Sequence, residues 1–167
     1  IIIMQITTTP MNTVLSFTTK TDSINAEAGS IVTASDLRWL RLALQQAERS
    51  THSKWKVGAV VVRGGSVLGK GSNKYRNDPA FVHHHDVSYH AEAVAIKKAG
   101  GNVAGATIYV ARITSGGNLG LAKPCLRCQN LLDDHSVHSA IWTVPTGMQK
   151  LRISELVLET ASHRRAS

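Results

Sequence analysis

A helical pattern of apolar positions marks the first regular part of the chain. Leucine and alanine residues recur every three or four positions, which places their side chains on one face of a helix; they are Leu37, Leu40, Leu44 and Ala47. Thr33 or Ser35 can cap the start of this segment, because a hydroxyl accepts a hydrogen bond from an unpaired N–H of the first turn. The pattern predicts a helix from Ser35 to about Arg49.

A run of β-branched residues follows and predicts a buried strand. Val57 to Val62 is apolar throughout, Gly64-Gly65 is a turn signal, and Val67 to Gly71 continues beyond it. Together they predict a β-hairpin whose first strand is buried. Residues 73–87 are polar, carry turn signals and show no periodicity, so we expect a loop there that is either functional or mobile.

The second half of the chain alternates between strand and helix patterns. The stop signal Gly100-Gly101 ends one helical stretch, and Pro124 precedes another. The predicted elements are a helix at about 90–99, a strand at 107–110, a helix at about 125–134 and a strand at 139–144. This order favours a parallel sheet with helices packed on it. Residues 151–160 fit either a strand or a helix.

The two ends of the chain differ from this central region. Residues 1–33 are rich in threonine, poor in charge and without a sustained period, so we expect a mostly disordered N-terminal arm. Residues 161–167 contain Arg164-Arg165, and we expect a frayed basic tail there. The 167 residues suit one domain, which we place at residues 34–160.

Composition and charge narrow the class of protein. The chain is 43% hydrophobic, which excludes global disorder, and its longest apolar runs of about six residues predict no membrane-spanning helix. A formal net charge of +8 favours anionic partners such as nucleotides or nucleic acid, although the scattered basic residues also fit a solvated surface. The two cysteines, Cys125 and Cys128, indicate a reducing cytoplasm and metal-binding or redox chemistry.

Two short motifs carry the candidate chemistry: His90-Ala91-Glu92 and, with 34 residues between His90 and Cys125, Pro124-Cys125-Leu126-Arg127-Cys128. Thiolates three positions apart on the first turn of a helix project to one side, and an imidazole at the start of another helix can face them. Three such ligands make a zinc site with one coordination position open, as in catalytic sites. Water bound there has its pKa lowered towards ~7, and Glu92 is placed to carry protons.

The combination of H-x-E with P-C-x-x-C is the signature of zinc-dependent nucleobase deaminases, in which hydroxide attacks C4 of cytosine or C6 of adenine. Two other interpretations use the same residues. Cys125 and Cys128 could form a thioredoxin-like redox pair. Alternatively, the zinc could be structural, with a fourth ligand from another histidine. The candidate fourth ligands are His83, His84, His85, His135 and His138.

The sequence resembles the cytidine and deoxycytidylate deaminase superfamily from about Ser35 to about Val144. The stretches that carry the resemblance are 57–62, 67–73, 90–92 and 124–128. The resemblance implies an α/β protein with a three-layer α/β/α fold, in which a mixed sheet of about five strands is flanked by helices. It also implies one catalytic Zn²⁺ held between two helix starts by His90, Cys125 and Cys128.

The resemblance further implies roles for residues around the metal. Asn73 would hydrogen-bond the sugar or base of the substrate, although Asn is also common wherever a strand ends. The N–H of Ala91 would donate to the pyrimidine carbonyl, and the carbonyl of Lys123 would accept from the departing amino group. Family members are usually oligomers, so we expect a homo-oligomer.

The substrate is harder to predict than the reaction. The spacing from Cys128 to the strand at 139–144 resembles the deoxycytidylate and tRNA-adenosine branches. The loop before His90 resembles an insertion of deoxycytidylate deaminases, and its histidines could bind a second metal or simply be solvated; they are His83, His84 and His85. A mononucleotide also needs a phosphate contact, for which the candidates are Lys74, Arg76, Lys123 and Arg127.

These observations predict a hydrolytic deaminase that converts a cytosine nucleotide, foremost dCMP, to the uracil nucleotide and ammonia. A second hypothesis is deamination of cytosine or adenine in RNA or single-stranded DNA, because aromatic residues fall in or beside the loop before His90; they are Tyr75, Phe81 and Tyr89. A third is a zinc-binding module without turnover, in which Glu92 would be dispensable.

Overall fold

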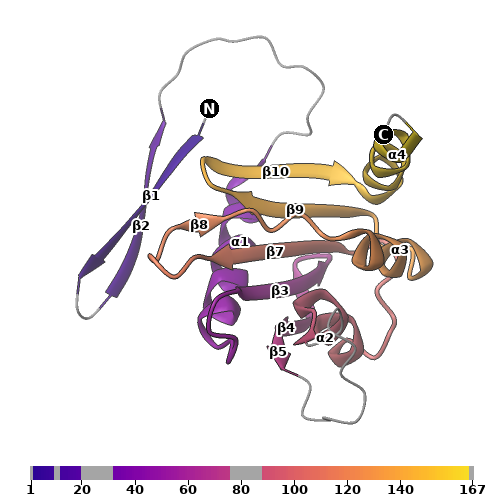
Figure 1. Ribbon diagram of the computed structural model, residues 1–167, viewed down its shortest axis with the longest axis horizontal. Helices are drawn as coiled ribbons and strands as arrows, with labels where there is room; N and C mark the ends of the chain where they lie inside the picture. The colour runs from indigo at the N-terminus through magenta and orange to yellow at the C-terminus, as the bar shows by residue number, and fades with distance from the viewer. Residues whose placement is uncertain (1, 10–11, 20–31, 76–87, 166–167) are drawn as a thin grey trace.

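The fold is built around one mixed β-sheet, as a computed structural model shows (Figure 1). The structure describes residues 2–9, 12–19, 32–75 and 88–165, without side-chain detail for the first two ranges and for 163–165. The strand order is β10-β9-β7-β3-β4, with β8 paired to β7. These strands are β3 (Lys56–Arg63), β4 (Ser66–Ser72), β7 (Thr107–Ile113), β8 (Leu119–Gly120), β9 (Ser139–Val144) and β10 (Gly147–Arg152).

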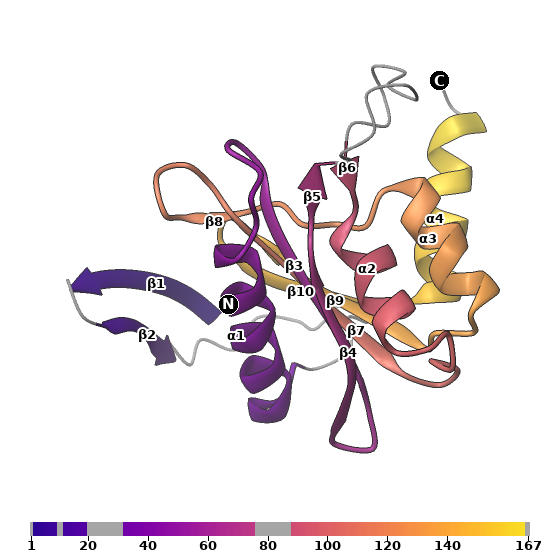
Figure 2. The same ribbon diagram turned by 90° about the horizontal axis from the view of Figure 1, so that it is seen from below.

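Helices cover both faces of this sheet, which gives the three layers expected from the sequence (Figures 1 and 2). Val60 and Val62 of β3 pack towards α1 (Ala34–Glu48), whereas Ala59 and Val61 face the other side. The alternation follows from the two-residue repeat of a strand. The opposite face packs against α2 (Ala91–Lys98), α3 (Leu126–Asp134) and α4 (Ile153–Arg165). The three-layer fold class is therefore confirmed.

Glycines in the central hairpin let two helices approach the sheet closely. A Cβ on Gly58 would lie 2.2 Å from the carbonyl oxygen of Ala43 in α1. On the other face, a Cβ on Gly69 would lie 2.2 Å from the carbonyl oxygen of Ala95 in α2, and one on Gly71 would lie 2.8 Å from that of Ala91. The hairpin sequence therefore fixes where the N-terminus of α2 lies.

The expectation of a parallel sheet is wrong for all but one pair of strands. Only β7 and β9 pair in parallel within the described sheet. The hairpins β3–β4 and β9–β10 are antiparallel because short turns join them. The chain crosses from β4 through α2 to the other side of β3, where β7 pairs with β3. The strand β7 therefore runs antiparallel to its neighbour β3.

The C-terminal segment contains both of the elements that its sequence allowed. Residues up to Arg152 form β10, and α4 begins at Ile153 and ends at Arg165. Residues 161–165, where we expected a basic tail, belong to the last part of this helix. The strand β10 was not predicted, because Gly147 to Arg152 lacks a clean alternation of apolar and polar residues.

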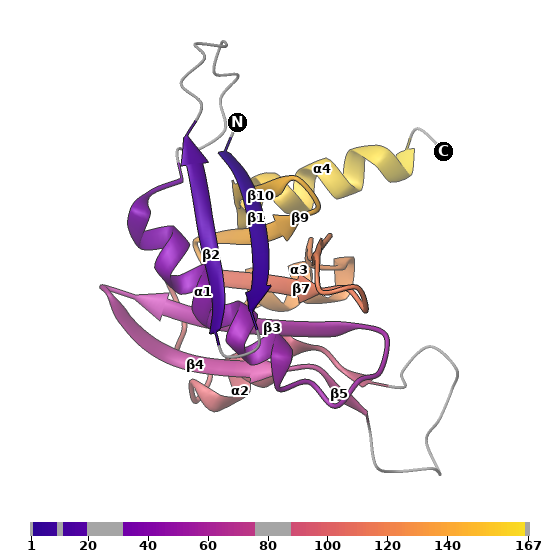
Figure 3. The ribbon, with the colours of Figure 1, turned by 90° about the vertical axis from the view of Figure 1, so that its left-hand side faces the viewer.

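The N-terminal arm contains regular structure that its sequence did not suggest to us. Ile2–Thr9 (β1) and Asn12–Thr19 (β2) pair antiparallel, with Thr9 opposite Asn12 (Figures 1 and 3). Isoleucine and threonine are β-branched and favour extended backbone, which suits these two strands. Residues 20–31 of the expected arm lie outside the described residues.

The start of α1 is fixed by a capping box. The Thr33 side chain accepts from the N–H of Asp36, and the Asp36 carboxylate accepts from the N–H of Thr33. Thr33 rather than Ser35 is therefore the N-cap. The same carboxylate accepts from the hydroxyl of Tyr109 at 2.8 Å and pairs with Lys150 at 3.2 Å, which ties α1 to β7 and β10.

Among the helices that the structure describes, none has the length and apolar character needed to cross a bilayer.

Candidate metal centre and active site

His90 lies between a two-stranded ribbon and a helix. In the ribbon, β5 (Lys74–Tyr75) pairs with β6 (Ser88–Tyr89), so that Lys74 lies opposite Tyr89. His90 is the next residue and caps α2 with extended backbone. The predicted helix start at about 90 is thus confirmed, and the ribbon fixes the backbone on the N-terminal side of the imidazole.

The two cysteines lie at the start of α3. Cys125 is the N-cap, and Cys128 lies in the first turn and is buried. A buried side chain stabilises the turn before them: the side-chain amide of Gln129 donates to the carbonyl of Pro124 at 2.7 Å. Thr160 of α4 in turn donates to the amide oxygen of Gln129 at 2.9 Å. Gln129 was missed by sequence reasoning, because a glutamine in a helix carries no sign of being buried.

The imidazole and both thiols meet at one point. His90 Nδ1 lies 3.5 Å from Cys125 Sγ and 3.3 Å from Cys128 Sγ. All three donor atoms lie within 4.8 Å of one another. Zinc bonds of ~2.0–2.1 Å to nitrogen and ~2.3 Å to sulfur at tetrahedral angles would place such atoms about 3.6 Å apart. The group that the structure brings together therefore fits a zinc ion.

No fourth ligand joins this group among the residues that the structure describes. His135 ends α3, and the N–H of His138 donates to the carbonyl of Ala106, just before β7 begins. Both histidines therefore lie towards the opposite end of these elements. His83, His84 and His85 lie outside the described residues. The three donors that the described residues supply fit a zinc site with one coordination position open.

The ionisable groups of the cluster shift one another's pKa. A hydrogen bond with Cys128 and a second with His90 lower the pKa of Cys125 to about 3. Cys128 shifts the other way, because the interaction with Cys125 and burial both raise its pKa. The hydrogen bond with Cys125 also raises the pKa of His90. One thiolate is thus stabilised at the helix N-terminus, which suits a cationic metal.

Glu92 is buried beside these ligands. Glu92 lies in the first turn of α2 and is only 5% exposed. Its carboxyl forms a hydrogen bond with the Cys128 thiol. Burial raises the pKa of this carboxyl above its ordinary value, while the charge of His90 opposes the shift. A carboxyl with a raised pKa next to a metal site can both accept and release a proton near neutral pH.

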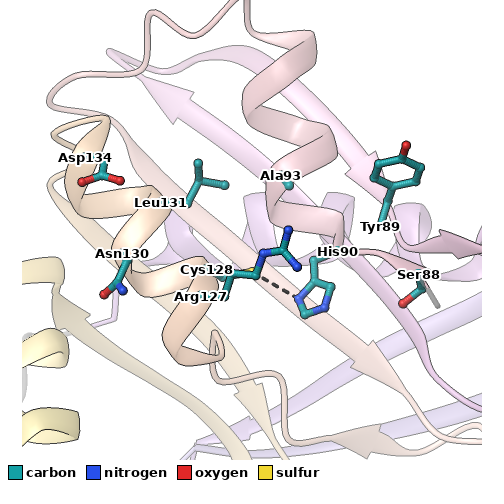
Figure 4. A pocket seen from close by; sticks show the side chains of 9 residues that line it. All are labelled: Ser88, Tyr89, His90, Ala93, Arg127, Cys128, Asn130, Leu131 and Asp134. Atoms are coloured by element: carbon teal, nitrogen blue, oxygen red, sulfur yellow. Dashed lines mark hydrogen bonds between the residues drawn. The ribbon is translucent and has the colours of Figure 1, made fainter. Parts of the chain in front are cut away.

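A pocket of about 420 Å³ opens beside the ligand group, between α2 and α3 (Figure 4). His90 and Cys128 line one end, and the guanidinium of Arg127 points towards the imidazole. Asp134 lies farther along α3. Neither Glu92 nor Asn73 is among the lining residues. The pocket therefore approaches the ligand group from the side of Arg127.

Asn73 is buried and serves the protein backbone. Its Oδ1 accepts from the N–H of Val57 at 2.8 Å and from the hydroxyl of Ser50 at 2.7 Å, while its Nδ2 donates to the carbonyl of Trp55 at 2.6 Å. These contacts use both lone pairs of the oxygen and one amide hydrogen. The structure thus gives Asn73 a local structural role. One N–H of its side-chain amide remains for a contact with a substrate.

The other predicted contacts lie at the same edge of the sheet. Ala91 is the first residue of α2 and is buried. Lys123 comes just before the Pro124 turn, and its ammonium pairs with Glu159 of α4 at 2.8 Å. Arg76, a phosphate candidate, lies outside the described residues, as does Phe81.

Comparison with known proteins identifies the family. A family model described as the cytidine and deoxycytidylate deaminase zinc-binding region matches residues 33–144. The match covers both motifs and every strand of the main sheet except β10. The chain belongs to this family, and the resemblance stated from the sequence is confirmed. No curated protein sequence matches the chain significantly.

Solved structures share the fold at low identity. The dCMP deaminase of the cyanophage S-TIM5 in apo form is 19% identical, with a TM-score of 0.55, covering 77% of this chain and 94% of the phage chain. The cytidine deaminase of Burkholderia pseudomallei is 20% identical, with a TM-score of 0.56, covering 75% of this chain and 96% of the other. The phage enzyme in complex with dCMP and dUMP also matches, with 19% identity, a TM-score of 0.52 and coverage of 67% and 82%.

Proposed function

We propose that this protein is a zinc-dependent hydrolytic deaminase that converts a cytosine nucleotide, foremost dCMP, to the uracil nucleotide and ammonia. The observation that carries the proposal is the buried Glu92 carboxyl beside the cluster of His90, Cys125 and Cys128. A zinc-binding module without turnover has no need of a buried carboxyl, which is unfavourable to retain in a protein interior.

His90, Cys125 and Cys128 are the residues that would hold the zinc ion. When bound, zinc would supply a nucleophile at neutral pH by lowering the pKa of water, and the reaction adds that water at C4 of the base. Glu92 accepts one proton from the water and transfers it to ring nitrogen N3, where it stays. Glu92 then takes the second proton from the new C4 hydroxyl and gives it to the amine, so that the C4–N bond breaks and the C4 carbonyl forms. The balance is one cytosine and one water giving one uracil and one ammonia.

Backbone groups beside the ligands orient the base in this proposal. The N–H of Ala91 donates to the pyrimidine carbonyl, and the carbonyl of Lys123 accepts from the amino group that leaves. Support comes from their positions: each residue lies within two positions of a ligand, at the start of α2 and just before α3. Asn73 contributes its remaining N–H, and otherwise keeps Val57 and Trp55 in place.

Arg127 is the residue that we propose for the phosphate of dCMP. Its guanidinium points into the pocket beside His90, and the planar fork of arginine matches phosphate oxygens. The other two described candidates, Lys74 and Lys123, are less suitable because a lysine ammonium offers no planar fork to the phosphate oxygens. The similar phage enzyme was solved with dCMP and dUMP, which makes dCMP the first substrate to test.

The remaining parts of the proposal concern ion count, assembly and location. We propose one catalytic zinc ion, since one ligand group is found among the described residues and the loop histidines lie outside them. A homo-oligomer in a reducing cytoplasm suits the family and the two unbridged cysteines.

The decisive experiment measures ammonia release by the zinc-loaded protein. The substrates are dCMP, CMP, deoxycytidine, cytidine, adenosine and a cytosine-containing oligonucleotide. We expect dCMP to turn over, Glu92→Ala to lose at least about 10²-fold in kcat while retaining zinc, and Cys128→Ala to lose zinc. Arg127→Ala should raise KM for dCMP by about tenfold or more and leave deoxycytidine unaffected.

Each arm of the experiment has an outcome against the proposal. Turnover of the oligonucleotide alone would favour the second hypothesis, deamination within RNA or single-stranded DNA. If the wild type and Glu92→Ala both bound zinc and neither turned over any substrate, a non-catalytic zinc module would be favoured. Equal KM effects of Arg127→Ala on dCMP and deoxycytidine would remove Arg127 from the phosphate site.

A further inference from the structure

A serine at the end of the first helix is buried against the residue that follows β4. Ser50 comes directly after Arg49, the C-cap of α1, and is only 8% exposed. Its hydroxyl donates to Asn73, 23 positions away in sequence, at 2.7 Å to Oδ1 and 2.9 Å to the backbone carbonyl. A hydroxyl has one hydrogen, so these two acceptors share it. Ser50 is therefore a buried donor to the Asn73 side chain.

Backbone groups of the loop after α1 orient the Ser50 hydroxyl. The N–H of His52 donates to Ser50 Oγ at 3.1 Å, which leaves the hydroxyl hydrogen for Asn73. His52 is itself held in place, because its Nδ1 accepts from the N–H groups of Lys54 at 3.3 Å and Trp55 at 3.1 Å. The loop thus presents the hydroxyl in a fixed direction.

Ser50 completes the hydrogen bonds of Asn73 Oδ1. This oxygen has two lone pairs, of which the N–H of Val57 uses one and the Ser50 hydroxyl uses the other. Nδ2 donates one of its two hydrogens to the carbonyl of Trp55. The Asn73 amide therefore has no free acceptor and one free N–H, so it can only donate to a further partner.

Asn73 also lies next to the segment that carries the ligand histidine. In the β5–β6 ribbon Lys74 lies opposite Tyr89. Asn73 precedes Lys74 and His90 follows Tyr89, so these two residues occupy the next position of the antiparallel ribbon. The backbone of Asn73 is fixed as well, since its N–H donates to the carbonyl of Val57 at 3.0 Å.

We propose that Ser50 is a positioning residue, which fixes the Asn73 amide so that its free N–H meets an acceptor oxygen of the substrate. The proposal rests on the deamination proposed above and adds a residue that acts on it through Asn73. Without the Ser50 hydroxyl, Oδ1 is held by the Val57 N–H alone. A donor that is already fixed loses less conformational entropy when the substrate binds.

Steady-state ammonia release from dCMP by the full-length zinc-loaded protein tests the proposal. Ser50→Cys keeps a similar shape but offers only a weak S–H donor. We expect KM to rise about three- to tenfold and kcat to stay within about twofold, because a contact made equally in the ground and transition states acts on KM. Ser50→Thr retains the hydroxyl and should keep KM within about twofold of the wild type.

Ser139→Ala is the matched control for the loss of a buried serine bond. Ser139 is 4% exposed, and its hydroxyl lies 3.0 Å from that of Thr107. Both residues begin their strands, whereas Val57, to which Asn73 bonds, pairs with the far end of β7. We expect Ser139→Ala to lower stability in urea unfolding about as much as Ser50→Cys, and to leave KM unchanged.

A second measurement needs no turnover. NMR of isotope-labelled protein follows the exchange of the side-chain amide hydrogens of Asn73 with solvent. We expect the hydrogen that is bonded to Trp55 to exchange at least about threefold faster in Ser50→Cys than in the wild type, because the amide opens more often. Exchange in Ser139→Ala should match the wild type.

Three kinetic results would overturn the proposal. They are a wild-type KM in Ser50→Cys, an equal rise of KM in Ser50→Cys and Ser139→Ala, or a KM in Ser50→Thr as high as that in Ser50→Cys. If the wild type released no ammonia, the deamination proposal would fail and the amide exchange would decide. Unchanged exchange in Ser50→Cys would then show that Ser50 does not hold Asn73, whereas faster exchange would support its positioning role.

Discussion

Gln129 connects the metal-binding turn to the C-terminal helix. It is 2% exposed, and its amide bonds both the Pro124 carbonyl and the Thr160 hydroxyl. Because Pro124 directly precedes Cys125, this amide fixes the backbone that carries a proposed metal ligand. Removing a residue that hydrogen-bonds and orients a metal-binding segment commonly lowers the metal affinity by about 10–100-fold. Gln129 is therefore a positioning residue in our interpretation.

Replacing Gln129 with leucine should weaken zinc binding. Leucine has a similar volume but cannot bond the Pro124 carbonyl, which would be left buried without a partner at a cost of about 1–3 kcal/mol. We expect about a tenfold or greater loss of zinc affinity, measured by competition with a chromophoric chelator. Gln149→Leu on the exposed side of β10 is the matched control. Wild-type zinc affinity in a folded but destabilised Gln129→Leu protein would mean that Gln129 serves packing alone.

At the scale of elements, close contact between strand and helix places the site. Gly58 lies against α1, while Gly69 and Gly71 lie against the backbone of α2. Any larger residue would push a helix away from the sheet. Since His90 caps α2, the distance between β4 and α2 also decides where the imidazole lies relative to the cysteines of α3.

Gly58→Ala should be strongly destabilising for this reason. The added Cβ would lie 2.2 Å from the carbonyl oxygen of Ala43 and 2.3 Å from the backbone nitrogen of Ala47, so α1 would have to move. Overpacking of this kind costs about 1–3 kcal/mol or more, measured by urea unfolding. Gly116→Ala is the control, because the nearest atom to its Cβ would be 3.6 Å away, in the side chain of Asn118. Equal effects of the two substitutions would contradict the close-contact argument.

At the scale of the whole molecule, one buried network joins the first helix to the last hairpin of the sheet. Asp36 of α1 accepts from Tyr109 of β7 and pairs with Lys150 of β10, which lies 114 positions away in sequence. Burial tends to raise the pKa of Asp36, but hydrogen bonds from Thr33, Tyr109 and Lys150 outweigh it and lower the pKa. Burial and the neighbouring Asp36 raise the pKa of Tyr109.

This network predicts a loss of stability at both ends of the pH scale. A carboxyl with a lowered pKa in the folded state stabilises the fold above its unfolded pKa of about 3.9, and that contribution disappears as the pH falls through the folded pKa. The raised pKa of Tyr109 acts in the opposite sense, so its contribution is lost as the pH rises above about 10.

The midpoint of thermal unfolding, measured from acid to alkaline pH, checks both predicted losses of stability. We expect Asp36→Asn to lower the midpoint at neutral pH and to flatten the acid side of the profile, and Tyr109→Phe to flatten the alkaline side. Asp133→Asn, an exposed carboxyl on α3, should change stability at neutral pH by no more than about 0.5 kcal/mol. If the unfolding midpoint of Asp36→Asn fell as steeply at acid pH as that of the wild type, this network would not be the origin of the loss of stability in acid.

The sequence by itself determined the candidate metal-binding group and the local elements of this protein. The spacing of His90, Cys125 and Cys128 predicted the candidate ligand group, because each motif lies at a helix start and helix geometry is local. The capping residue Thr33 was also recognisable, since a cap interacts within three positions of itself. Short-range patterns therefore identified what the residues can do.

Tertiary structure decided what depends on residues far apart in the chain. The antiparallel placement of β7 follows from which side of β3 the crossover takes, and the local pattern is the same for either side. The burial of Gln129 and the local bonds of Asn73 arise from packing between separate segments. Packing energies are set by three-dimensional neighbours, and residues that are distant in sequence become neighbours only when the chain has folded.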